Sequence, residues 1–174
     1  MYSDHNSVKR ISSLGAGPIG GGWSAHFLAR GYDVTAYLHD KSETNSFMSI
    51  LKTAWISLAE LGLAPSASMD RLRIVTDLEE ALDGADFVQE SGPERIEVKQ
   101  KLYSEMGKIV PPSIIIGSST SGLMMSDIQS DCSTPERTVI GHPFNPPYLL
   151  PLVEIVGGKR TAPEAVAWLS LIHI

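Results

Sequence analysis

The sequence predicts an α/β protein with an open, doubly wound and mostly parallel sheet. Two observations carry this prediction. Short apolar runs rich in β-branched residues alternate along the chain with longer segments in which apolar residues recur every three or four positions. One short run, at 113–117, is almost pure isoleucine, which is typical of a strand covered on both faces. Strands and helices that alternate at this spacing favour a parallel sheet with helices on both sides.

The segments expected to form this fold follow one another in a regular order. The expected strands are 8–14, 34–38, 73–75, 86–89, 113–117, 139–142 and 152–156. The expected helices are the segment from Gly20 to Gly31, then 44–62, 78–82, 94–109 and a last helix that begins at 162. The segment 44–62 has one apolar face and closes on a glycine, and Asp77 is the expected N-cap of 78–82.

Composition limits the classes of function that the chain can have. Its 174 residues are 43% hydrophobic and 20% charged, which suits a globular protein with one sizeable core. A net charge of −6 argues against nucleic acid or an anionic membrane as a partner. The single cysteine, Cys132, allows no disulfide framework and no cysteine-based metal site, so no metal is expected. The N-terminal MYSDHNSVKR lacks the apolar core of a signal peptide, so we expect a cytoplasmic protein.

A glycine pattern follows the first expected strand and opens the first expected helix. It consists of Gly15, Ala16, Gly17, Pro18, Ile19 and Gly20. In this setting the first glycine permits a tight turn, the second lets the backbone approach a pyrophosphate, and the third allows close packing of helix on strand. The helix N-terminus then attracts the anion. The alternative is a glycine-rich turn without a ligand. We expect a Rossmann-type domain that binds a dinucleotide at this loop.

The second expected strand should end in an acidic residue that binds the adenosine ribose. The expected position holds Leu38, and an acid appears only two residues later, at Asp40. Asp40 is therefore the candidate, and the alternative is that it caps the following turn. No arginine stands nearby to bind a 2′-phosphate, although Lys41 is adjacent, so NAD is favoured over NADP.

A histidine and a glutamate flank the proline-rich connection between the last two expected strands. His142 ends one strand, and Glu154 lies on the strand that returns. Both are expected at the carboxyl edge of the sheet, where a carboxylate on one imidazole nitrogen helps the other nitrogen to take a proton. The pair is therefore a candidate for acid/base chemistry. A histidine near prolines, taken by itself, is more often a hydrogen-bonded turn residue.

The segment Gly-His-Pro-Phe-Asn-Pro at 141–146 resembles the signature of the 3-hydroxyacyl-CoA dehydrogenase superfamily, and the similarity extends over about residues 8–168. The resemblance implies that His142 and Glu154, twelve residues apart, form a proton-transferring dyad. It also implies that Ser121 binds the substrate oxygen and that Asn145 lies near the nicotinamide. A simple turn residue is the alternative for Ser121.

Two further residues fall where the family contacts its cofactor and substrate. The resemblance implies that Glu94 contacts the nicotinamide-side ribose and that Lys99 positions the substrate. The alternatives are a carboxylate in the first turn of a helix for Glu94 and a solvated helix residue for Lys99. The chain departs from the family at Leu38, where relatives usually place the ribose aspartate.

Within the superfamily, the sequence at 88–95 and 141–154 is most similar to that of L-carnitine dehydrogenases. This similarity implies an NAD-dependent oxidoreductase that transfers a hydride from the 3-hydroxyl carbon of L-carnitine to NAD⁺. One alternative is another small-molecule substrate, an L-3-hydroxyacyl-CoA such as 3-hydroxybutyryl-CoA, or L-gulonate. The alternative of another class is a non-catalytic NAD-binding protein or a structural protein similar to lambda-crystallin.

Members of the superfamily continue into an all-helical domain that closes the substrate cleft and makes a homodimer. We expect residues 1–168 to be the NAD-binding domain without that helical domain. Residues 169–174, Leu-Ser-Leu-Ile-His-Ile, match the translation of the end of a common sequencing-library transposon, so we expect a non-native tail. His173 is then expected to have no function.

Overall fold

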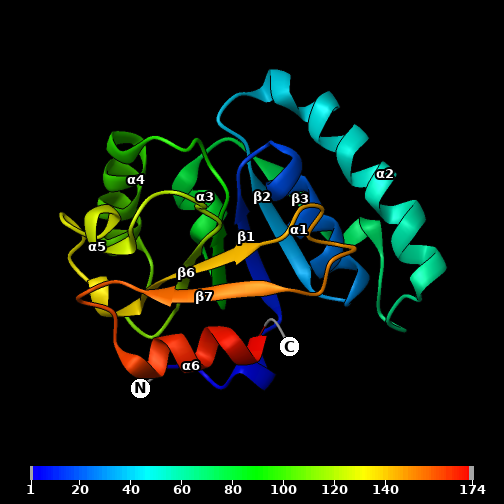
Figure 1. Cartoon of the computed structure of the whole chain (residues 1–174). Coiled ribbons are helices and arrows are strands. Elements are labelled where there is room, and N and C mark those ends of the chain that lie inside the picture. The colour runs from blue at the N-terminus through cyan, green and yellow to red at the C-terminus, as the bar shows by residue number, and fades with distance from the viewer. Residues whose placement is uncertain (1, 173–174) are drawn as a thin grey trace.

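The structure is a computed structural model that describes residues 2–172, and its centre is a twisted seven-stranded sheet (Figure 1). The strands are β1 (Arg10–Leu14), β2 (Asp33–Tyr37), β3 (Leu72–Val75), β4 (Phe87–Glu90), β5 (Ile116–Ser118), β6 (Thr138–Pro143) and β7 (Val153–Gly157). Their order in the sheet is β3-β2-β1-β4-β5-β6-β7. All neighbours pair in parallel except β6 and β7, which are antiparallel. The predicted fold class is confirmed.

Helices connect these strands. They are α1 (Pro18–Ala29), α2 (Thr44–Leu61), α3 (Leu78–Leu82), α4 (Ile96–Ile109), α5 (Met125–Ile128) and α6 (Pro163–Ile172). The centre of the predicted apolar face of α2 is buried, whereas Leu61 at its end is exposed, and Gly62 ends the helix. The prediction that Asp77 caps α3 is confirmed, because its side chain accepts a hydrogen bond from the Glu80 amide at 2.8 Å. The short α5 was not expected from the sequence.

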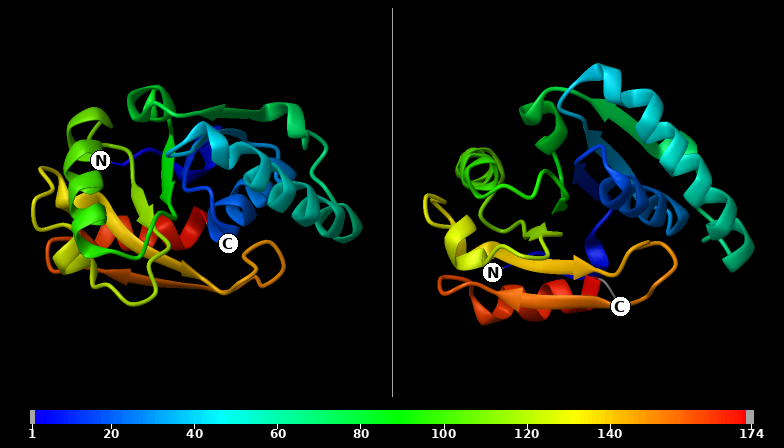
Figure 2. Two further views of the ribbon diagram at one scale, coloured as in Figure 1. Left: turned by 90° about the horizontal axis from the view of Figure 1, so that it is seen from above. Right: turned by 45° about the horizontal axis from the view of Figure 1, so that its top comes forward.

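The sheet separates two apolar cores. One core packs α1, α2 and α6 against one face of the sheet. The other packs α3, α4 and α5 against the opposite face. Figure 2 shows α4 on one side of the strands and α1 on the other, with α2 running along the outer side of α1. Helices on both faces explain why nearly every residue of the central strands β1, β4 and β5 is buried.

The largest shift from an expected boundary is at the fifth strand. The sequence predicts a strand over 113–117, whereas β5 covers only Ile116–Ser118. The guanidinium of Arg137, which is fully buried, donates to the carbonyls of Pro111 at 2.6 Å and Ile114 at 3.0 Å. Carbonyls that bind this guanidinium are held in a turn, and the strand therefore starts later.

The last helix, α6, extends into the segment 169–174, which the sequence predicts to be a non-native tail, as far as Ile172. Within α6, Trp168 and Leu169 are buried in the core beside α1. A buried leucine says nothing of the origin of a segment, so the expectation of a non-native tail stays a prediction. His173 lies outside the described residues. No helix within residues 2–172 is long and apolar enough to cross a membrane.

The strand order places a crevice at the centre of the sheet. The chain moves outward in one direction from β1 to β2 and β3, and in the other direction from β4 onward. Connections therefore leave the carboxyl ends of β1 and β4 toward opposite faces. Ligands of open α/β sheets bind at such a switch point.

Candidate active site

The loop between β1 and α1 has the geometry of an anion cradle. Gly15 has a φ of +127°, and a Cβ there would lie 2.4 Å from the carbonyl oxygen of Ser91. A Cβ at Gly20 would lie 2.1 Å from the carbonyl oxygen of Gly15. By contrast, a Cβ at Gly17 would meet nothing within 4 Å, so this glycine faces open space. Gly17 is also the N-cap of α1 and makes no side-chain cap, which leaves the helix N-terminus available to an anion.

A cleft of about 800 Å³ starts at this loop and extends over the carboxyl edge of the sheet. Its walls come from the glycine loop, the residues after β2, the turn after β4 and the first turns of α4. The open face of Gly17 and the position of the cleft at the glycine loop fit a dinucleotide with its pyrophosphate at the α1 N-terminus. Neither His142 nor Ser121 lines this cleft.

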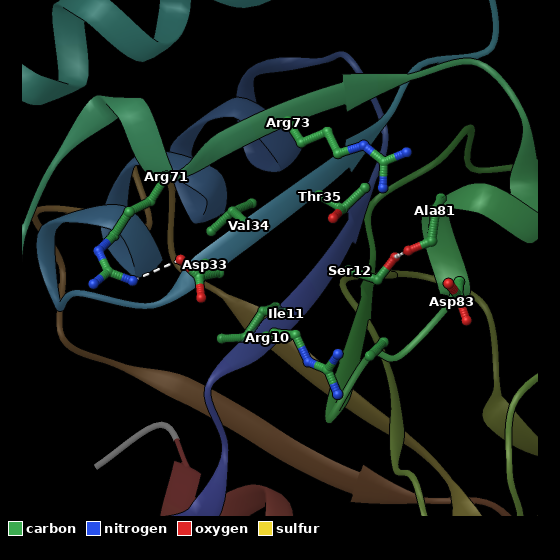
Figure 3. A pocket seen from close by; sticks show the side chains of 11 residues that line it. Arg10, Ile11, Ser12, Asp33, Val34, Thr35, Arg71, Arg73, Ala81 and Asp83 are labelled. Atoms are coloured by element: carbon green, nitrogen blue, oxygen red, sulfur yellow. Dashed lines mark hydrogen bonds and ion pairs between the residues drawn. The ribbon is translucent and has the colours of Figure 1, made fainter.

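A smaller pocket of about 270 Å³ lies at the opposite edge, beside the amino ends of β1 and β2 (Figure 3). Three arginines gather there. Arg71 donates to Asp33 at 2.6 Å, as the dashed line in Figure 3 shows. Arg10 lies 3.8 Å from Asp86, and Arg73 pairs with Glu80. Because carboxylates of this chain already neutralise these cations, the pocket lacks the excess positive charge that an anion requires.

Asp40 takes the role that the sequence analysis gave as its alternative. Its carboxylate accepts a hydrogen bond from the Ser42 amide at 2.7 Å and caps the short 3-10 helix Lys41–Glu43. Asp40 is exposed and does not line the cleft, whereas His39 and Glu43 do. Asp40 thus caps its own turn and lies outside the lining of the cleft, and its assignment as the ribose acid stays a prediction.

Lys99 is not the solvated helix residue that one reading of the sequence expected. Its side chain is 1% exposed, and its ammonium donates to Glu90, which is itself fully buried, at 2.7 Å. Ser118 also donates to the Glu90 carboxylate, at 2.7 Å, and the Gly92 amide does so at 2.6 Å. Lys99 therefore ties α4 to β4 and β5. Its assignment as a ligand-contacting residue rests on the resemblance and stays a prediction.

Glu94 organises the loop that carries Ser121. The helix begins only at Ile96, so the reading of Glu94 as a first-turn helix carboxylate is wrong. Its Oε1 accepts from the Thr120 hydroxyl at 2.6 Å and from the amides of Ser121 and Gly122 at 2.9 Å each. Partial burial raises the pKa of Glu94, but these three hydrogen bonds and the Lys99 charge outweigh it, and the pKa is lowered from its usual value.

Ser121 and His142 lie at the same edge of the sheet. Ser118 ends β5 and pairs with Ile140 of β6, so Ser121 and His142 follow neighbouring parallel strands at their carboxyl ends. The Ser121 side chain is exposed, and its hydroxyl lies 3.5 Å from Glu94 Oε1. The structure thus links Ser121 with Glu94, whose Oε2 lies 3.7 Å from the Lys99 ammonium. The substrate contact of Ser121 stays a prediction.

His142 and Glu154 are joined directly. They are partners in the antiparallel register of β6 and β7, and His142 Nδ1 lies 2.8 Å from Glu154 Oε2. The side chains are 28% and 58% exposed. Within residues 2–172 no protein group hydrogen-bonds the other ring nitrogen, Nε2. A ring held this way donates from Nδ1 to the carboxylate and offers Nε2 as a base.

Asn145 lies on the loop from 144 to 152 that connects β6 and β7. Its side chain is exposed and forms no hydrogen bond within the described residues, so the structure does not join it to His142 or Ser121. The loop itself is fixed against α1, since a Cβ at Gly22 would lie 2.7 Å from Pro147. A role of Asn145 near the nicotinamide therefore stays a prediction.

Sequence reasoning missed two residues that shape this site. Glu90 lies within the segment 88–95 without being predicted as a site residue, yet its buried carboxylate joins Lys99, Ser118 and Gly92. Its signal in the sequence is an acid at the end of an expected strand that is covered on both faces, because a buried carboxylate requires partners. Glu43 was also missed, although it lies three residues beyond Asp40 and lines the cleft. Residues 2–172 contain no group of three or more His, Cys, Asp or Glu able to hold a metal.

Comparison with known proteins agrees with this geometry. The model of the 3-hydroxyacyl-CoA dehydrogenase NAD-binding domain matches residues 10–171. An L-carnitine dehydrogenase of Streptomyces coelicolor is 51% identical over 99% of this chain and 54% of its own length. An L-carnitine dehydrogenase of Pseudomonas putida is 49% identical over 95% of this chain and 52% of its own length. The chain thus spans about half the length of the curated relatives it matches.

Solved structures show the same fold. The NAD⁺-dependent 5-formyl-3-hydroxy-2-methylpyridine 4-carboxylic acid 5-dehydrogenase has a TM-score of 0.87 at 32% identity, over 95% of this chain and 54% of that one. The 3-hydroxybutyryl-CoA dehydrogenase of Escherichia coli has a TM-score of 0.86 at 29% identity, over 96% of this chain and 37% of that one. The glycine cradle, the His142–Glu154 pair and the family match over 10–171 agree. The chain belongs to the family of the NAD-binding domain of 3-hydroxyacyl-CoA dehydrogenases, and its cofactor is NAD.

Proposed function

We propose that this chain is the cofactor-binding half of an NAD-dependent dehydrogenase that oxidises L-carnitine at its 3-hydroxyl carbon to 3-dehydrocarnitine. The observation that carries the proposal is the His142–Glu154 contact of 2.8 Å at the carboxyl edge of a sheet whose first loop is an anion cradle. The choice of substrate is supported by the names of relatives that are 45–52% identical to the chain.

The residues of the chain take complementary parts in this reaction. The glycine loop and the α1 N-terminus bind the pyrophosphate of NAD, and bound NAD supplies the hydride acceptor. His142 takes the hydroxyl proton at Nε2, while Glu154 orients the ring and stabilises its protonated form. Ser121 donates a hydrogen bond to the substrate oxygen, from a loop that Glu94 holds through two backbone amides.

Substrate and partners beyond this half are also proposals. Phe144, Leu149, Leu150 and Leu152, all on the β6–β7 segment, are 40–55% exposed. An apolar edge of this kind supports a partner surface that covers it, and we propose the second half present in the relatives, through which a homodimer forms. The net charge of −6 supports a small-molecule substrate over nucleic acid or a membrane surface, and a cytoplasmic location is proposed with it.

The test joins this chain to the second half of the Streptomyces coelicolor relative and measures NADH absorbance with L-carnitine, L-3-hydroxybutyryl-CoA and L-gulonate. Turnover with L-carnitine at a kcat/KM at least tenfold above the others is expected. A higher kcat/KM with the CoA ester or with L-gulonate would show that L-carnitine is not the preferred substrate. Binding of NAD⁺ without turnover of any of them would favour a non-catalytic protein.

In the same fusion, His142→Gln is expected to lower kcat by about 10²–10⁴-fold, because a positioned acid/base contributes that much. The Kd for NAD⁺ should stay within about twofold of the parent value, since His142 does not line the cleft. Stopped-flow absorbance and isothermal titration calorimetry check the two parts. Retained kcat would remove His142 from its role as the base.

A further inference from the structure

The end of β2 offers no acid to the adenosine ribose. Leu38 follows the last residue of β2 and is fully buried in the core that contains α1. Its backbone amide donates to the Val75 carbonyl at 3.0 Å, which fixes it as an extension of the strand. An apolar, buried side chain cannot bind hydroxyl groups. The carboxylate that usually recognises the ribose must therefore come from elsewhere if this chain has one.

Glu43 presents a carboxylate to the cleft. It lies at the end of the 3-10 helix Lys41–Glu43, is half-buried, and lines the cleft together with Tyr37 and His39. Its Oε2 accepts the Asp40 amide at 3.1 Å. Within residues 2–172 no protein donor contacts Oε1. The capping interaction thus holds the side chain in place and leaves one oxygen for a ligand.

The charges along this part of the cleft also favour a neutral ribose. The ionisable side chains that line the cleft beyond the glycine loop include three carboxylates, Glu43, Glu97 and Glu105, and one ammonium, Lys101. Lys101 lies 4.0 Å from Glu105, so its charge is shared with that carboxylate. Burial, followed by the charges of Glu105, Asp77 and Glu43, raises the pKa of Tyr37, which reports the same negative field. A 2′-phosphate would be repelled here.

We propose that Glu43 accepts hydrogen bonds from the adenosine ribose hydroxyls and sets the preference of this chain for NAD over NADP. The proposal rests on the NAD-binding function above. It places the ribose acid at Glu43, in place of the candidate Asp40 and of the usual family position, which holds Leu38 here. Glu43 acts here as a specificity-determining residue: its carboxylate accepts from hydroxyl groups and repels a phosphate at the same position.

The test measures Kd values of the 174-residue chain for NAD⁺, NADP⁺ and 2′-deoxyadenosine-NAD⁺ by isothermal titration calorimetry. Glu43→Gln removes the charge but keeps an oxygen that can cap the Asp40 amide. Asp40→Asn is the matched control, since asparagine caps as well as aspartate. Far-UV circular dichroism and thermal melting verify the fold of both variants.

In the parent chain, NAD⁺ is expected to bind at least about tenfold more tightly than NADP⁺ or the deoxy analogue, the discrimination typical of a charged hydrogen bond. Glu43→Gln should raise the Kd for NAD⁺ about tenfold, leave the Kd for the deoxy analogue unchanged and lower the Kd for NADP⁺. Asp40→Asn should change none of the three by more than about twofold.

Three outcomes would overturn the inference while leaving the proposed function intact. These are equal NAD⁺ affinity in the parent and Glu43→Gln, an equal loss for NAD⁺ and the deoxy analogue, or a loss of NAD⁺ affinity in Asp40→Asn. If the Glu43→Gln variant fails to fold, the affinities of the parent chain for NAD⁺ and for the deoxy analogue still test the inference. Equal affinities for the two ligands would show that no carboxylate binds the ribose 2′-hydroxyl. A parent chain that binds no NAD⁺ would overturn the proposed function as well.

Discussion

Single residues in this molecule owe their roles to what surrounds them. Lys99 and Lys108 both lie on α4, yet Lys99 is 1% exposed beside Glu90 and Lys108 is exposed. The helical period places one lysine toward the sheet and the other toward solvent. An ammonium in the core is tolerated because a carboxylate and a network of donors meet it there.

Breaking this buried ion pair should be costly. Lys99→Met is expected to lower the free energy of unfolding by about 3–5 kcal/mol, because it leaves the Glu90 carboxylate buried without its counter-charge. The double variant Glu90→Gln/Lys99→Met should recover most of that loss. Urea unfolding measures both, with Lys108→Met as the control on the same helix. A single variant no less stable than the control would contradict the account.

His26 gives the protein a specific response to acid. Its Nδ1 is buried without a hydrogen-bond partner, and burial, followed by the nearby Arg30 charge, lowers the pKa of the ring to about 4 from 6.5. The unfolded chain therefore binds this proton at a higher pH than the folded protein does. The stability contribution of the neutral ring is complete above about pH 6.5 and is lost progressively as the pH falls toward about 4.

In urea unfolding at several pH values, the parent chain should lose up to about 3 kcal/mol more than His26→Gln between pH 6.5 and 4, at about 1.4 kcal/mol per pH unit. The carboxylates titrate in both proteins, so their contribution cancels in the difference. Identical pH profiles of the two proteins would show that His26 does not titrate differently on folding.

At the scale of elements, the glycines of the loop from β1 to α1 meet two different requirements. One is close packing within the protein, and the other is space for the ligand. Gly20 is needed for packing, because a Cβ there would lie 2.1 Å from the Gly15 carbonyl oxygen. Gly17 is needed for the ligand, because a Cβ there would meet nothing in the protein and its φ of −76° suits any residue. The same residue type is therefore present for different physical reasons.

Gly17→Ala and Gly20→Ala should consequently differ. Both are expected to weaken NAD⁺ binding by at least about tenfold, the first by a clash with the pyrophosphate and the second by displacing the loop. Only Gly20→Ala should also lower the melting temperature by several degrees, as expected for a loss of about 1–3 kcal/mol through overpacking. Calorimetric titration and thermal melting measure the two effects. Equal melting temperatures would contradict the separation.

The β6–β7 pair is the other element with a chemical consequence. The antiparallel register places His142 opposite Glu154, and opposed side chains on one face of such a pair are close enough to interact. A spacing of twelve residues in the chain becomes a contact of 2.8 Å because the loop between the strands returns the chain in that register.

At the scale of the whole molecule, the two apolar cores share one sheet. Leu28 lies in the core of α1, α2 and α6, and Ile128 lies in the core of α3, α4 and α5; both are fully buried. Strands β1, β4 and β6 contribute side chains to both cores. Loss of one core therefore removes support from the other, and a single cooperative transition is expected.

Leu28→Ala and Ile128→Ala should each lower the free energy of unfolding by about 2–5 kcal/mol, as large-to-small changes in a core do. In both variants, urea transitions followed by tryptophan fluorescence and by far-UV circular dichroism should coincide. Trp23 and Trp168 belong to the Leu28 core, so fluorescence is the sensitive probe for Ile128→Ala. A fluorescence midpoint left unchanged by Ile128→Ala would show that the two cores unfold separately.

Local patterns determined the fold class, the glycine loop, the Asp77 cap and the candidacy of His142 with Glu154. These features depend on periodicity, turn chemistry and spacing along the chain, and all three can be read from residues close together in the sequence. The hydrogen-bond partners of Glu90, Lys99, Glu94 and Glu43 were decided only by the tertiary structure. The field and partners of a charged side chain come from segments far away in the sequence, such as Ser118 for Glu90 and Thr120 for Glu94. The choice between Asp40 and Glu43 likewise depended on the tertiary structure, because both carboxylates cap the same turn and only Glu43 lines the cleft.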